Sequence, residues 1–210
     1  MMRKALTTAE LMVALTIVGV IAVLVLPSMV QNYHKKIYVS KLQKTYMELS
    51  NAVEQACADN NVSSFFYTPY AARLNNTQTK AFFKKYMKVK SEVSGFSSFY
   101  KAIDGSSHAS YIQGSPVMLS GGQAISMVCD GSGNPTRTCY VFLDINGKEE
   151  PNMAGRDMFT FSINARTNEI YDWFGEDKCL SGNAKIGSTN AANGGGCLAK
   201  ILKSNWKMEY

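Results

Sequence analysis

The chain has 210 residues, which is enough for one domain with an appended segment. Its 22 lysines and arginines outnumber its 16 aspartates and glutamates, so the formal net charge is +6. Only 18% of the residues are charged whereas 46% are hydrophobic, which excludes a disordered chain and a polycation. Two histidines and five cysteines argue against a multi-histidine metal enzyme and against a disulfide-dense mini-protein.

The N-terminal segment combines a short basic leader with a long apolar stretch. Residues 11–30 contain no charged side chain, and as a helix they span about 30 Å, the thickness of a bilayer's hydrocarbon core. We therefore predict one transmembrane helix. A cleaved secretory signal would have a shorter apolar core followed by a small-residue cleavage site, and the sequence has neither. A plain signal anchor leaves Glu10 unexplained, because a carboxylate at the edge of the hydrocarbon is costly.

Residues 4–13 (KALTTAELMV) resemble the K-G-F-T-L-x-E-L-M-V signature of type IV pilins and type II secretion pseudopilins. The resemblance implies that a prepilin peptidase cuts between Ala5 and Leu6 on the cytoplasmic side and then methylates the new amine. It matches Glu10 to the signature glutamate, and Pro27 stands where pilins carry a helix-kinking proline. Ala5 replaces the signature glycine and Leu6 replaces the phenylalanine.

Glu10 has a physical role in this interpretation that does not depend on the family. Cleavage would leave a positive amine on Leu6 among apolar helices, and an unpaired buried charge is expensive. If Glu10 of one subunit met the Leu6 amine of its neighbour, both charges would be satisfied and the axial register would be set. The alternative is that Glu10 only extends to the lipid headgroups. The expected partners are other copies or other pilins, the peptidase and the inner-membrane assembly machinery.

The charges that flank the membrane segment predict a different membrane orientation from the one that the prepilin resemblance implies. Arg3 and Lys4 precede it, whereas four lysines follow it soon after (Lys35, Lys36, Lys41 and Lys44). By the positive-inside rule this distribution would place the C-terminal part in the cytoplasm. The prepilin resemblance implies the opposite orientation, a single-pass protein of the bacterial inner membrane with its head outside the cytoplasm. We follow the resemblance, because the motif is specific and the paired cysteines described below favour an oxidising compartment.

Apolar residues recur with helical spacing beyond the membrane segment. We predict a single helix from Leu6 to about Ala58, bent at Pro27 and stopped by residues 59–61. Its second half would pack against a head through one stripe of side chains: Tyr38, Leu42, Tyr46, Leu49, Val53 and Cys57.

Short β segments separated by turn residues dominate the chain after Gly114. The expected strands are Val117–Leu119, Ala124–Val128, Thr138–Asp144, Asp157–Asn164 and Glu169–Trp173. We therefore expect an α+β, pilin-like fold in which a long N-terminal helix packs on an antiparallel sheet. The predicted parts are a leader (residues 1–5), the long helix (6–60, with 11–30 in the membrane) and a globular head (61–210).

Residues 79–90 (TKAFFKKYMKVK) predict a short amphipathic helix with aromatic residues toward the core. Its lysines form the most basic cluster of the chain: Lys80, Lys84, Lys85, Lys88 and Lys90. Lysines interleaved with aromatic residues can bind nucleic acid, so DNA is one candidate partner. The alternative, which we favour, is a solvated face beside a buried one.

Four of the cysteines form two local pairs in sequence. Cys129 and Cys139 bracket a turn-rich loop, and Cys179 and Cys197 bracket a loop that ends in three glycines. Both pairs are candidate disulfides, although four cysteines allow three pairings. The second loop resembles the C-terminal disulfide-bounded loop of many type IV pilins. Cys57 is left over, and its place on the helix stripe predicts a buried thiol.

The segment from Asp144 to Asp157 carries several oxygen ligands of the kind that calcium prefers. Asp144 and Asn146 precede a glycine turn, and Asn152 and Asp157 follow it. It begins like an EF-hand loop but lacks the third ligand and the distal glutamate. The alternative is a structural turn in which Asp144 and Asn152 cap backbone amides.

The sequence contains none of the usual nucleotide-binding, serine-hydrolase or zinc-protease motifs, so we do not expect an enzyme and expect no required cofactor. We expect a structural subunit of a type IV pilus or a type II secretion pseudopilus. The alternative is a minor pilin or adhesin whose head binds DNA or a surface.

Overall fold

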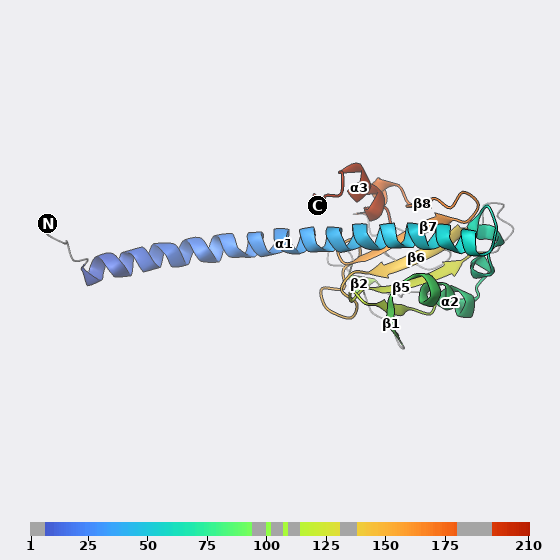
Figure 1. The fold of residues 1–210 in the computed structure, drawn as a ribbon. Helices are drawn as coiled ribbons and strands as arrows, with labels where there is room; N and C mark the ends of the chain where they lie inside the picture. The colour runs from blue at the N-terminus through green and yellow to red at the C-terminus, as the bar shows by residue number, and fades with distance from the viewer. Residues whose placement is uncertain (1–6, 94–99, 102–106, 109–113, 131–137, 180–194) are drawn as a thin grey trace, which may run out of the picture. The chain divides into compact units, whose positions relative to one another are not determined.

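The computed structural model describes residues 7–93, 100–101, 107–108, 114–130, 138–179 and 195–210. They belong to two compact units, Met1–Ile37 and Tyr38–Tyr210, and each unit is described by itself. Helix α1 (Thr8–Asp59) contributes its first part to one unit and its second part to the other (Figure 1). It ends where the sequence predicted, next to Asn61, whose φ of 51° is in the left-handed region. The predicted start at Leu6 lies outside the described residues.

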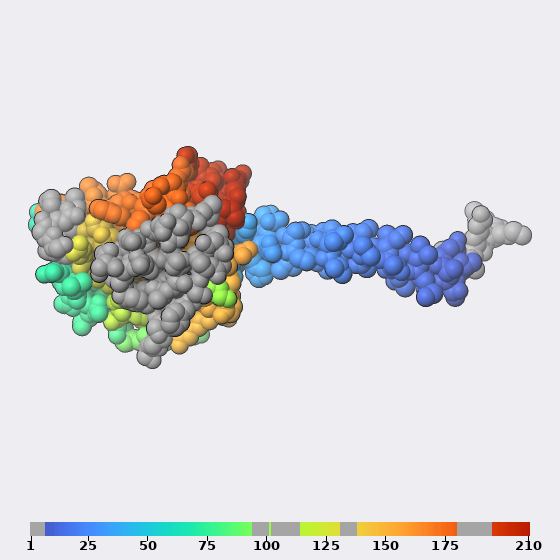
Figure 2. Space-filling model, turned by 180° about the vertical axis from the view of Figure 1, so that it is seen from behind, coloured from blue at the N-terminus to red at the C-terminus, as the bar shows by residue number. Residues whose placement is uncertain are grey.

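The first unit consists, in its described part, of the apolar portion of α1. The helix is long and apolar enough, by length and composition, to cross a membrane. Its helical conformation continues through Pro27, which stands inside α1. The large apolar side chains between Leu11 and Val30 are exposed; Figure 2 draws this N-terminal part of the chain in blue.

The second part of α1 belongs to the core of the second unit. The predicted stripe is confirmed: Leu42, Leu49 and Val53 are fully buried, while Tyr38 and Tyr46 are partly buried and pack on the same core. Cys57 at the end of the stripe is a buried free thiol, as expected. The stripe packs because α1 places residues three and four apart on one face.

A six-stranded antiparallel sheet forms the centre of the second unit (Figure 1). The strand order β1-β4-β5-β6-β7-β8 leaves β1 and β8 at the edges. A separate pair consists of β2 (Tyr100–Lys101) and β3 (Ser107–His108). The strands of the large sheet are β1 (Val89–Glu92), β4 (Val117–Leu119), β5 (Ala124–Cys129), β6 (Thr138–Asp144), β7 (Met158–Asn164) and β8 (Ile170–Tyr171).

The sheet carries a different apolar cluster on each face. Met127, Val141 and Phe161 are in register on neighbouring strands and belong to the core that includes the buried side of α1. One residue along, Val128 and Phe142 belong to a second, smaller cluster. Because side chains alternate across a strand, two apolar clusters in alternating register require a sheet that is buried on both faces. Strand β5 therefore shows no polar–apolar alternation in burial.

The predicted strands agree with the structure, two of them to the residue (Val117–Leu119 and Thr138–Asp144). The predicted helix over residues 79–90 is wrong at both ends. Helix α2 (Asn76–Tyr86) begins earlier, where Asn75 accepts a bond from the Gln78 amide through its side chain, and it ends where Met87 becomes extended. The residues after Met87 extend because they pair with β4 as strand β1.

Short helices complete the second unit. The 3-10 turns η1 (Phe65–Tyr67) and η2 (Pro69–Ala71) follow α1, and η3 (Glu176–Lys178) follows β8. Helix α3 (Cys197–Lys203) was not predicted from the sequence. It is only seven residues long, and burial of Leu198 and Ile201 in the main core stabilises it.

Candidate functional site

The N-terminus of α1 is capped by Thr7 and Glu10, which hydrogen-bond to each other. The backbone amide of Thr7 and its hydroxyl each donate to Glu10 Oε2 at 2.9 Å, and the Glu10 amide donates to Thr7 Oγ1 at 3.3 Å. This is a capping box, which satisfies amides that have no partner inside the helix. The Thr-x-x-Glu spacing is visible in the sequence, but neither of the roles expected for Glu10, assembly or extension to the lipid headgroups, includes capping. The predicted cleavage residues Ala5 and Leu6 lie outside the described residues.

The apolar surface of α1 is the largest exposed hydrophobic feature of the described chain. Val23 and Leu24 each expose 73% of their surface, and Leu11, Met12 and Leu15 expose more than half. A continuous apolar surface of this kind is unfavourable in water, so it requires lipid or another protein. The first part of α1 is therefore a candidate membrane or assembly surface.

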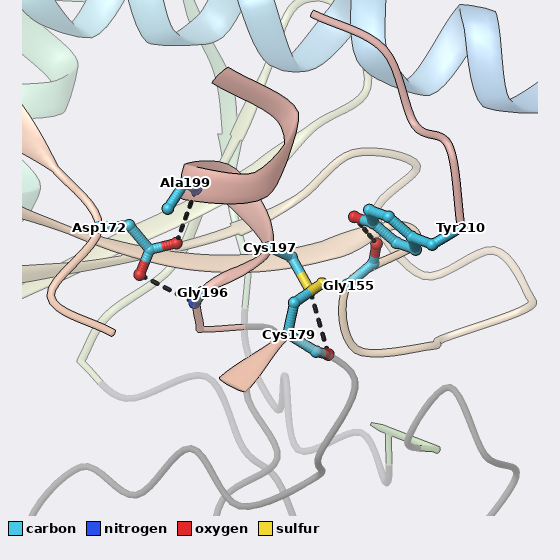
Figure 3. Close-up of a disulfide and its surroundings, with 7 residues drawn as sticks. All are labelled: Gly155, Asp172, Cys179, Gly196, Cys197, Ala199 and Tyr210. Atoms are coloured by element: carbon cyan, nitrogen blue, oxygen red, sulfur yellow. Dashed lines mark hydrogen bonds between the residues drawn. A yellow bond between two sulfur atoms is a disulfide. The ribbon is translucent and has the colours of Figure 1, made fainter. Parts of the chain in front are cut away.

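The structure forms both predicted disulfides. Cys129 and Cys139 lie directly opposite each other on β5 and β6 and are bonded. Cys179 follows η3 and is bonded to Cys197, the first residue of α3 (Figure 3). The interior of the second loop, residues 180–194, lies outside the described residues. The disulfide therefore joins the two ends of this loop beside β8 and α3.

A partly buried carboxylate accepts several backbone hydrogen bonds beside the second disulfide. Asp172 follows β8 and points toward the first turn of α3 (Figure 3). Its Oδ1 accepts from the amides of Gly196 at 2.9 Å and Phe174 at 3.1 Å, and its Oδ2 accepts from the Ala199 amide at 3.1 Å. Burial raises the pKa of Asp172, and these amide bonds oppose the rise. The sequence analysis missed Asp172, because the amides of α3 that it binds lie 24 and 27 residues away.

Tyr210 connects the end of the described chain to the loop between β6 and β7. Its hydroxyl donates to the Gly155 carbonyl at 2.8 Å (Figure 3). Burial raises the pKa of Tyr210, so the hydroxyl keeps its proton for this bond. The loop and the C-terminal residues are thus one packed region.

The candidate calcium ligands are brought into one loop, where backbone amides occupy their carboxylates. Asp144 Oδ1 accepts from the Asn146 amide at 3.1 Å. Asp157 is fully buried and accepts from the amides of Asn152 at 2.8 Å and Met153 at 2.6 Å. Burial raises the pKa of Asp157, and these bonds oppose it. Of the two caps predicted for a structural turn, the one by Asp144 is confirmed, whereas Asn152 donates its own backbone amide to Asp157, which was predicted only as a metal ligand.

Two buried amide oxygens of this loop, Asn146 Oδ1 and Asn152 Oδ1, have no hydrogen-bond partner among the described residues. In the described part of the chain, no three histidine, cysteine or carboxylate side chains are grouped as metal ligands would be. Calcium at Asp144, Asn146, Asn152 and Asp157 therefore stays a prediction. It would have to compete with the backbone amides for the two carboxylates.

The basic cluster of α2 is partly neutralised by acidic residues. Lys80 and Lys84 both pair with Glu92 on β1, and Lys85 pairs with Asp59 at the end of α1 at 2.8 Å. Phe82 and Phe83, which could stack on bases if exposed, are fully buried. This arrangement favours the structural interpretation of the helix over an extended nucleic-acid surface.

No known family model, curated protein or solved structure matches this chain. The functional interpretation therefore rests on its residues and its architecture.

Proposed function

We propose that this chain is a pilin-like structural subunit of a type IV pilus or a type II secretion pseudopilus. The observation that carries the proposal is the prepilin-like segment at residues 4–13, followed without interruption by an exposed apolar helix whose second part is the core helix of an α+β unit. A membrane anchor with a capped helix would account for the apolar residues and for Glu10, but it would not account for the rest of the signature at residues 4–13.

The chemistry of assembly would centre on Glu10. Removal of residues 1–5 would leave a positive amine on Leu6, and burial of that charge among packed helices requires a negative partner. A carboxylate has about four lone-pair sites, so Glu10 can keep its two bonds from Thr7 and still accept a neighbour's amine. The pairing would satisfy both charges and set the axial register of the subunits.

The same proposal assigns a location and partners. The subunit would reside in the bacterial inner membrane through residues 11–30, with its head outside the cytoplasm. It would be processed by prepilin peptidase and then polymerised with copies of itself or with other pilins by inner-membrane machinery. The two disulfides support this side of the membrane, because structural disulfides persist in oxidising compartments.

Assembly of Glu10 variants tests the proposal. We expect Glu10→Ala to remain in the membrane fraction while wild type is recovered in the sheared surface or pseudopilus fraction. Leaving the amine unpaired costs about 3–5 kcal/mol, so assembled material should fall by roughly 100-fold or more. Thr7→Ala is the matched control, because it removes the hydroxyl of the capping box and leaves the carboxylate. Normal assembly of Glu10→Ala, or an equal loss in Thr7→Ala, would contradict the proposed pairing.

A second function, capture of DNA or a surface by the head, has less support. Three of the five lysines of the α2 region are paired with carboxylates, and two of its aromatic residues are buried. The Cys179–Cys197 loop offers no argument for it, because residues 180–194 lie outside the described residues.

A further inference from the structure

A cavity of about 330 Å³ opens beside the basic face of α2. Five lining residues come from that helix, and their spacing of one, three and four places them on one face: Asn76, Thr77, Lys80, Ala81 and Lys84. Glu92 of the edge strand β1 and Ser115, shortly before β4, line the rest. The volume lies in the range of small-molecule sites.

Two ammonium groups share one carboxylate in this cavity. Lys80 Nζ lies 2.6 Å from Glu92 Oε2, and Lys84 Nζ bonds to Glu92 Oε1. Bonds from the two lysines lower the pKa of Glu92 to about 2, so the carboxylate stays ionised near neutral pH. The three charged side chains that line the cavity therefore sum to a single positive charge.

Both lysines retain the capacity to bind a further anion. An ammonium group has three donors, and a bond to Glu92 uses one donor of each lysine. Their side chains are 28% and 50% exposed, so they are open to solvent. The hydroxyls of Thr77 and Ser115 and the amide of Asn76 add neutral donors to the same lining.

We propose that this cavity is a binding site for a compact phosphate anion, either inorganic phosphate or a phosphate monoester. Lysine binds phosphate as a point charge, and a tetrahedral oxyanion has enough oxygens to accept from both ammonium groups and a hydroxyl together. A carboxylate ligand would bring one charge and two oxygens, and would use fewer of these donors. The proposal does not depend on assembly of the chain into a filament.

Calorimetric titration of the full chain in detergent micelles with inorganic phosphate tests the site. We expect saturable binding of phosphate, weaker binding of acetate, and at least about tenfold weaker phosphate binding in Lys80→Gln/Lys84→Gln. Lys85→Gln is the matched control, because Lys85 belongs to the same helix but pairs with Asp59 away from the cavity. We expect it to bind phosphate as wild type does.

Glu92→Gln supplies a test that a folding defect cannot imitate. The substitution removes the competing carboxylate and raises the charge of the lining from one to two, so phosphate should bind about tenfold more tightly, the lower end of what one nearby charge does to an ionic equilibrium. Unchanged or weaker binding in Glu92→Gln would overturn the proposal. An equal loss in Lys85→Gln, or saturable binding of a single-stranded oligonucleotide at concentrations where phosphate does not bind, would overturn it as well.

Discussion

Asp172 is the residue that organises the C-terminal part of the second unit. Its carboxylate spans the end of β8 and the start of α3, and it accepts amide bonds from residues that precede and follow Cys197. Cys197 is in turn bonded to Cys179, so the carboxylate and the disulfide both connect the start of α3 to the residues that follow β8.

We predict that Asp172→Ala loosens this region. The variant leaves the amides of Gly196 and Ala199 without their acceptor, which costs about 1–3 kcal/mol. Hydrogen exchange at these two amides should accelerate by roughly 5- to 150-fold. Asp177→Ala is the control, because Asp177 is an exposed acid of η3 that pairs with its neighbour Lys178. Exchange rates that stay at the wild-type level in Asp172→Ala would refute this role.

The contribution of a carboxylate to the stability of the fold depends on pH, and its sign differs between the two aspartates Asp172 and Asp157 and the exposed Glu92. Folding raises the pKa of Asp172 and Asp157, so each favours the folded state most below its ordinary pKa of 3.8 and less as pH rises through its folded pKa. Folding lowers the pKa of Glu92 from 4.5 to about 2, so its contribution is present above pH 4.5 and is lost as pH falls toward 2. Acid therefore removes the contribution of the α2–β1 ion pairs to stability, whereas it leaves the contribution of these two aspartates in place.

At the scale of elements, α1 carries two surfaces with different environments. Between Leu11 and Val30 its apolar residues are exposed, whereas from Val39 onward one face is buried in the core and the other is solvated. A helix that is apolar on all sides requires lipid or protein around it, while an amphipathic one requires a single partner face. One continuous helix can therefore serve both as an anchor or assembly surface and as part of a folded core.

Substitutions on the buried and the exposed side of the second part of α1 should differ sharply in their effect on the free energy of unfolding. Leu49→Ala removes a fully buried side chain and should lower the free energy of unfolding by about 2–5 kcal/mol. Met47→Ala, two residues earlier and 58% exposed, should change it by less than about 0.5 kcal/mol. Urea unfolding followed by near-ultraviolet circular dichroism measures both. Equal effects of the two substitutions would mean that the buried stripe is assigned to the wrong face.

At the scale of the whole molecule, the charges around the apolar segment and the prepilin-like motif predict opposite orientations. Four lysines follow residues 11–30 closely, and two basic residues precede them. The disulfides favour a head outside the cytoplasm. Processing would distinguish the two orientations, because the proposed cleavage between Ala5 and Leu6 takes place on the cytoplasmic side of the membrane.

We predict that the mature chain recovered from its native membrane begins at methylated Leu6. Intact-mass measurement combined with N-terminal sequencing checks this directly. A chain that still begins at Met1 would indicate a simple signal anchor, and one that begins beyond Pro27 would indicate secretion. Either result would remove the proposed pilin mechanism, whereas the phosphate site on α2 would be unaffected.

The features that depend on local pattern could be predicted from the sequence. The α1 stripe could be predicted because its apolar residues recur with the helical period of 3.6. Strand β6 could be predicted because a run of strand-forming residues lies between turn residues. The cysteine pairs were favoured because each pair is close in sequence. Glu10 could be identified as a candidate functional residue because it directly precedes the apolar residues 11–30.

The features that join distant residues became visible only in the folded chain. The end of α2 is set by the pairing of β1 with β4, and α3 exists because Leu198 and Ile201 are buried in the core. The roles of Asp172 and Glu92 depend on partners that other elements bring to them. Local propensity cannot encode such contacts, because their free energy comes from burial and charge pairing that arise only when the chain has folded.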